Sequence, residues 1–160
     1  MNTPQSPHAQ DLRKGRFSQA NQAYLLTSVT EERQKWFADF FIGRIVVDCM
    51  RQQQRLGQVE SLAFVVMPDH FHWLLVLQDG ASLSAVMRVV KGRSAHAIGQ
   101  CHQRAAQGKF WQDGFHDHAL RKDEDIKAAA RYIVANPLRA GLVSRIGDYP
   151  LWDAKWLSCE

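Results

Sequence analysis

The sequence predicts an α+β fold of the ferredoxin-like type, in which helices pack on an antiparallel sheet. Three observations favour it: strand-like and helix-like segments follow in the order βαββαβα, a tight hairpin lies in the middle of that order, and the helices carry apolar faces. Two β-α-β halves with a central hairpin make up the split ferredoxin-like arrangement. The 160 residues, 46% of them hydrophobic, suffice for one domain with its own core.

The first half of the chain alternates between strand and helix signals. Residues 22–29 read as a strand, and Thr30 is the expected N-cap of a helix over residues 31–55. The segments 59–67 and 70–77 are the two strands of the hairpin, which turns over a Pro-Asp pair.

The second half begins with a helix opened by Ser82, and a short strand at 115–120 precedes a last helix over 123–135. The apolar residues of the Ser82 helix share one face: Leu83, Val86, Met87, Val90, Ala97, Ile98 and Cys101. We expect residues 20–160 to form a single domain and residues 1–19 to form a flexible basic arm.

The second hairpin strand carries the first candidate site, His70-Phe71-His72. Residues alternate faces along a strand, so the two imidazoles point the same way and Phe71 points to the opposite side. Two imidazoles on one face can hold a first-row or magnesium-like cation and leave room for substrate oxygens. The alternative is an ordinary pair of half-exposed histidines, because spacing alone does not define a metal site.

The last helix carries the second candidate site. The helix dipole stabilises the acidic residues in its first turn, and Pro137 is expected to mark the end of the helix. At about 100° per residue, Tyr132 and Asn136 lie roughly 40° apart on one flank, beside a buried stripe. The stripe consists of Ile126, Ala129, Ala130 and Ile133. A phenol and an amide therefore share one edge, although an ordinary surface tyrosine is the alternative interpretation.

A second His-x-His, His116-Asp117-His118, competes for the metal. Its central residue is charged, so this strand would turn Asp117 toward the face opposite the histidines, where a core residue is expected. We therefore favour His70 and His72, and expect His116 to be exposed.

The charge of the chain is uneven. The positive excess lies in residues 81–122, which carry seven basic and two acidic residues, whereas residues 1–80 are balanced at eight of each and residues 123–160 carry five basic and six acidic residues. Trp111 and Phe115 adjoin these basic residues, a combination suited to phosphate neutralisation and base stacking. Solvated helix faces are the alternative for single residues such as Arg88.

Composition also indicates a compartment. The sequence has no apolar, uncharged run of about 18 residues, and its first 20 residues lack the apolar core of a signal peptide. Cys49, Cys101 and Cys159 are odd in number and show no CxxC spacing. We expect a cytoplasmic protein that does not engage a membrane.

Three stretches of the chain resemble the REP-associated tyrosine transposases, which are IS200-like, single-tyrosine members of the HUH endonuclease superfamily. They are residues 67–77, 111–121 and 130–143, and the similarity extends from about residue 12 to residue 152 in the same order. The resemblance implies an HUH motif on a central strand and a tyrosine on a C-terminal helix.

The resemblance further implies the roles of the candidate residues. His70, His72 and Asn136 would hold a divalent metal, Mg²⁺ or Mn²⁺, and Tyr132 would be the nucleophile that keeps a 5′ phosphate. His118 matches a motif position and is a candidate supporting residue. No residue is identified as the base that deprotonates Tyr132.

The partner implied by the resemblance is single-stranded DNA with a palindromic hairpin, bound by a monomer or, alternatively, a dimer. The candidate DNA contacts are Arg13, Lys14, Arg16, Lys91, Arg121 and Lys122. A hairpin-binding protein without cleavage activity and an autonomous insertion-sequence transposase remain alternatives. A histidine-triad hydrolase does not fit, since Leu74 stands where its third histidine is required.

Overall fold

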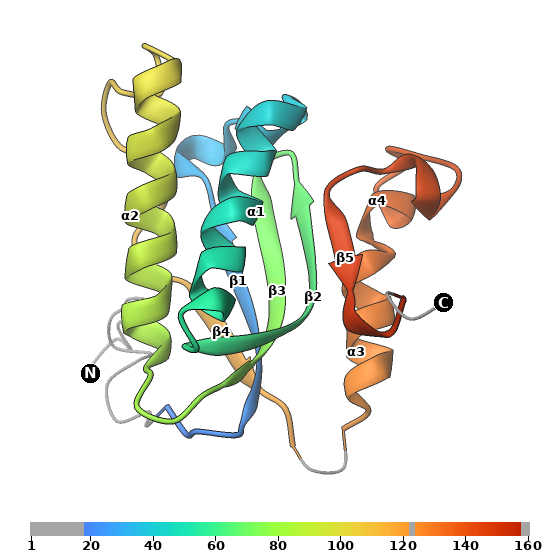
Figure 1. Ribbon diagram of the computed structural model, residues 1–160. Helices are drawn as coiled ribbons and strands as arrows, with labels where there is room; N and C mark the ends of the chain where they lie inside the picture. The colour runs from blue at the N-terminus through green and yellow to red at the C-terminus, as the bar shows by residue number, and fades with distance from the viewer. Residues whose placement is uncertain (1–17, 122–123, 158–160) are drawn as a thin grey trace, which may run out of the picture.

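A five-stranded antiparallel sheet forms the middle layer of the protein, and helices cover both of its faces (Figure 1). The computed structural model describes residues 18–121 and 124–157. The strand order is β4-β1-β3-β2-β5. The strands are β1 (Ala23–Val29), β2 (Val59–Met67), β3 (His70–Leu77), β4 (His116–Ala119) and β5 (Trp152–Ala154).

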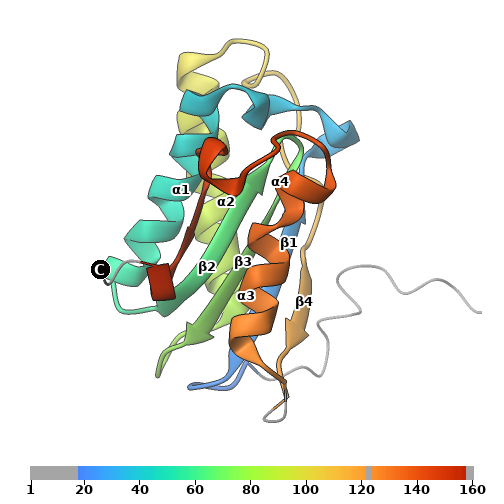
Figure 2. The same cartoon turned by 90° about the vertical axis from the view of Figure 1, so that its right-hand side faces the viewer.

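Two long helices pack on one face of the sheet, and two shorter helices lie on the other (Figure 2). The first pair is α1 (Phe40–Arg55) and α2 (Leu83–Cys101), and the second pair is α3 (Ile126–Val134) and α4 (Asn136–Arg139). This confirms the α+β, ferredoxin-like prediction, to which the structure adds α4 and the edge strand β5.

The alternation of β3 divides the core into two layers. Phe71, Trp73 and Leu75 are fully buried toward α1 and α2, whereas Leu74 is fully buried toward α3. Because His70 and His72 share the parity of Leu74, the strand presents them on the α3 face of the sheet. The apolar packing on the opposite face thus fixes the direction in which both imidazoles point.

The expected N-cap at Thr30 is wrong. The Thr30 hydroxyl accepts no hydrogen bond from a following backbone N–H, and it lies instead against the carbonyls of Gln34 and Asp69, to which it donates at 2.8 and 3.0 Å. Two 3₁₀ turns, Glu31–Arg33 and Trp36–Ala38, follow β1 instead. Helix α1 begins only after Asp39, whose carboxylate accepts from the backbone N–H groups of the first turn.

The expected boundaries of α2 and α3 need smaller corrections. Ser82 caps α2 as predicted, but Cys101 is exposed and Ser94 takes a buried position on the apolar face. Helix α3 starts later than expected, after its cap Asp125. Pro137 does not end the helical region, because it lies in the first turn of α4, where its missing N–H costs nothing. No helix in the described part of the chain has the length and apolarity needed to cross a membrane.

Candidate functional site

The two histidines of β3 are held in place through the same ring atom. His70 Nδ1 lies 2.6 Å from Asp69 Oδ1, and His72 Nδ1 lies 2.7 Å from Thr27 Oγ1. The ring centroids are 4.9 Å apart. Neither Nε2 atom makes a hydrogen bond to a described residue, so both remain for a ligand. This is the usual arrangement of metal-binding histidines, whose second nitrogen is anchored by the protein.

Asp69 fixes the tautomer of His70. Burial opposes ionisation of this carboxyl group, but hydrogen bonds and charges from His70 and Arg33 lower the pKa of Asp69 below its ordinary value. An ionised carboxylate can only accept, so His70 Nδ1 carries the proton and donates it to Asp69. The lone pair of His70 is therefore on Nε2.

His72 is held in its neutral form. Burial first, then the charges of His70 and Arg139, lower the pKa of His72 to about 4. A neutral imidazole is the form that binds a metal. The effect of Arg139 on His72 also shows that the C-terminal helices come close to the β3 histidines.

Tyr132 and Asn136 are joined by an arginine that the sequence analysis did not single out. The guanidinium carbon of Arg139 lies 3.9 Å from the centroid of the Tyr132 ring, a cation–π contact. Arg139 Nη2 donates to the Tyr132 carbonyl at 2.6 Å and to Asn136 Oδ1. The spacing i, i+4, i+7 on one helical face was the available signal for Arg139.

Exposure separates Tyr132 from the other tyrosines of the chain, which are two in number. The side chain of Tyr132 is 64% exposed, whereas that of Tyr24 is 4% exposed. Tyr149 is half-buried, donates to the Val66 carbonyl, and has its pKa raised to about 12 by burial. Tyr132 is therefore the tyrosine whose hydroxyl is accessible to a large ligand.

The second histidine pair lies on the same face of the sheet as the first. Thr27 pairs with His72 on one side and with His116 on the other, so one strand separates the two histidines by roughly 10 Å. His116 is exposed, as expected, and Asp117 pairs with Leu26 on the opposite face. His118 Nε2 lies 3.2 Å from Glu124 and makes no printed contact with the β3 histidines.

Metal-binding potential at this site depends on an amide rather than on a carboxylate. In residues 18–121 and 124–157, no three His, Cys, Asp or Glu side chains converge as a metal cluster. His70 and His72 offer two free nitrogens, and Asn136 is the side chain that would complete a set of three ligands. Its Oδ1 already accepts a hydrogen bond from Arg139.

The structure describes only some of the candidate DNA contacts. Arg13, Lys14, Arg16 and Lys122 lie outside the described residues. Lys91 donates to the carbonyls of Gln112 and Gly114, at 2.8 and 2.5 Å, and so ties the following loop to α2.

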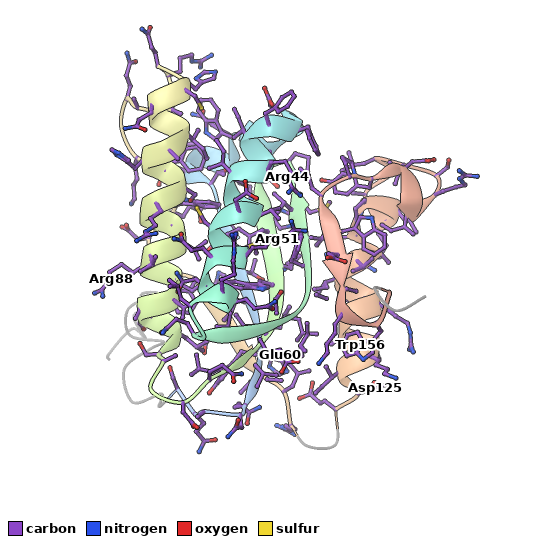
Figure 3. The ribbon with its side chains drawn as sticks, in the orientation of Figure 1. Arg44, Arg51, Glu60, Arg88, Asp125 and Trp156 are labelled. Atoms are coloured by element: carbon purple, nitrogen blue, oxygen red, sulfur yellow. The ribbon has the colours of Figure 1, made fainter. Side chains whose placement is uncertain are left out.

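Arg121 and Arg88 are both exposed but face different surroundings. Arg121 lines, with Phe115 and His118, an open cavity of about 440 Å³ beside β4. Arg88 projects outward from α2, on the side of the molecule away from α3 (Figure 3).

Comparison with known proteins identifies the family of the chain. A family profile described as transposase IS200-like matches residues 18–136. The chain is 33% identical over 92 residues to the REP-associated tyrosine transposase of Escherichia coli K12, a match covering 57% of this chain and 52% of that protein. The chain thus spans about half the length of this relative. A Haemophilus influenzae protein, provisionally named as a REP-associated tyrosine transposase, is 24% identical over 79% of this chain and 76% of its own length.

A solved structure shares the fold. It is a REP-associated tyrosine transposase bound to a REP hairpin, with a TM-score of 0.71, 24% identity, and coverage of 86% of this chain and 79% of the other. The five-stranded antiparallel sheet with helices on both faces is the fold of that structure. The chain belongs to the IS200-like transposase family.

Proposed function

We propose that the chain is a metal-dependent endonuclease and strand transferase for single-stranded DNA. It would act on palindromic hairpins of the REP type through a 5′-phosphotyrosine intermediate, with residues 20–160 as one catalytic domain. Membership of a transposase family supports the enzyme class. The observation that carries the finer proposal is the position of Tyr132, which is exposed and joined through Arg139 to Asn136, on the side of the sheet where His72 lies.

The proposed reaction is a transesterification. The Tyr132 oxygen loses its proton and attacks the scissile phosphorus, while the bond from phosphorus to the 3′ oxygen breaks and that oxygen takes up a proton. The phosphotyrosine ester keeps the energy of the broken bond. A 3′ hydroxyl can then attack the ester and restore a phosphodiester, which suits DNA rearrangement better than hydrolysis.

The side chains around Tyr132 have separate proposed tasks. His70, His72 and Asn136 would hold Mg²⁺ or Mn²⁺, which would neutralise charge on the phosphate oxygens and the departing 3′ oxygen. Asp69 and Thr27 orient the two imidazoles. His118 is proposed as a supporting residue; it lies on the edge strand β4, and its Nε2 is 3.2 Å from Glu124.

Replacement of the nucleophile tests the proposal. With a hairpin oligonucleotide and Mn²⁺, Tyr132→Phe should abolish the covalent adduct seen on a denaturing gel and leave hairpin binding within about twofold, since it removes one exposed oxygen. Tyr149→Phe is the matched control and should retain the adduct. An adduct that survives in Tyr132→Phe would refute the assignment. Binding without any adduct in the unsubstituted protein would favour the hairpin-binding alternative.

A further inference from the structure

Arg139 is held close to every group of the proposed site except His70. It contacts the Tyr132 ring, donates to the Tyr132 carbonyl and to Asn136 Oδ1, and its charge acts on His72. Its Nε and Nη1 atoms make no hydrogen bond to a described residue. These contacts give the guanidinium a fixed place next to the proposed ligands.

That place conflicts with cation binding in the absence of DNA. Asn136 Oδ1 is the proposed third ligand, and it already accepts from a positive guanidinium. A divalent cation on the same oxygen would lie near Arg139, and the two positive charges repel each other, although water screens the exposed guanidinium. The site in the DNA-free protein therefore contains a resident positive charge that competes with the metal.

A DNA phosphate would resolve this conflict. Its negative charge attracts both cations, and guanidinium groups bind phosphate oxygens through paired N–H donors. The Nε and Nη1 donors of Arg139 suit this role, since Nη2 holds the protein acceptors. The phosphate would then favour the metal and the arginine at the same time.

We propose that Arg139 is a positioning residue that weakens metal binding until a DNA phosphate enters the site. The inference rests on the proposed function, because it takes His70, His72 and Asn136 as the ligands. In the DNA-free protein Arg139 holds Asn136 and Tyr132 together. In the DNA complex the same guanidinium contacts the scissile phosphate, so metal binding and phosphate binding strengthen each other.

The test measures binding of Mn²⁺ alone, by electron paramagnetic resonance, without DNA. Arg139→Gln should bind Mn²⁺ about tenfold more tightly than the unsubstituted protein, since it removes the competing charge near the ligands. Arg139→Met, a neutral side chain of similar length, should show the same gain. Arg139→Lys keeps the charge and should stay close to the unsubstituted protein.

Arg131 provides the matched control, because it is an exposed arginine of α3 without a side-chain hydrogen bond to a described residue. Arg131→Gln should leave Mn²⁺ affinity unchanged. Unchanged or weaker Mn²⁺ binding in both neutral Arg139 variants would overturn the inference. A purely structural role for Arg139 predicts such a loss and never a gain.

A second measurement adds a hairpin oligonucleotide. The oligonucleotide should tighten Mn²⁺ binding in the unsubstituted protein and should do so less in Arg139→Gln; equal tightening would also overturn the inference. The proposed function fails separately: if His70→Ala with His72→Ala binds Mn²⁺ as well as the unsubstituted protein, the metal site itself is wrong. If that double variant loses Mn²⁺ and the Arg139 variants show no gain, only the role of Arg139 is wrong.

Discussion

Acidification should destabilise the metal-free protein through His72. The pKa of this imidazole is about 4 in the folded protein, against 6.5 for the ordinary group. The unfolded chain therefore binds a proton at a higher pH than the folded chain, and stability must fall as the pH drops from about 6.5 to about 4. At 1.36 kcal/mol per unit, the loss amounts to about 3 kcal/mol.

Urea unfolding at a series of pH values, with a chelator present, measures this loss. His72→Gln removes the titrating group. Between pH 6.5 and pH 4, the free energy of unfolding of this variant should therefore fall by about 3 kcal/mol less than that of the unsubstituted protein. His116→Gln changes an exposed histidine on the same sheet face and is the matched control. Parallel pH curves for the His72 variant and the unsubstituted protein would refute the reasoning.

Three further predictions concern the supports of the site and the DNA path. Asp69→Asn should weaken Mn²⁺ binding by calorimetry roughly 10- to 100-fold, because His70 loses its anionic partner; unchanged affinity would contradict this. Tyr149→Phe should lower the free energy of unfolding by about 1 kcal/mol in urea. Since its folded pKa is raised to about 12, the unsubstituted protein should lose stability as pH rises from 10 to 12, and the variant should lose less. In hairpin binding measured against salt, Arg121→Ala should reduce the log–log slope by about 0.7, whereas Arg51→Ala on α1 (Figure 3) should not; equal slopes would place the DNA elsewhere.

Sequence patterns predicted the elements that are determined by residues close together in the chain. The strands Val59–Met67 and His70–Leu77 match the two apolar segments that flank a Pro-Asp turn, and Ser82 caps its helix with its own side chain. The Thr30 side chain caps no helix, and its hydroxyl instead lies against the carbonyl of Asp69, 39 residues away in the sequence. No local pattern contains such a partner.

The candidate site shows the same limit. The spacing of His70 and His72 sufficed to place both on one face, but their hydrogen-bond partners come from another strand and from the turn. The sequence-based prediction ends the helix before Pro137 and so leaves Arg139 outside it. The chain in fact continues into α4, which brings Arg139 back over the ring of Tyr132.

The turn before His70 is clamped from several directions. Thr30 donates to the Asp69 carbonyl through both its backbone N–H and its hydroxyl, and the Phe37 N–H donates to the Pro68 carbonyl at 2.9 Å. Arg33 holds the Asp69 carboxylate at 3.1 Å. The carboxylate that aims His70 is therefore immobilised when the protein folds. The conformational entropy of the His70 imidazole is therefore lost during folding, and cation binding does not have to order that side chain again.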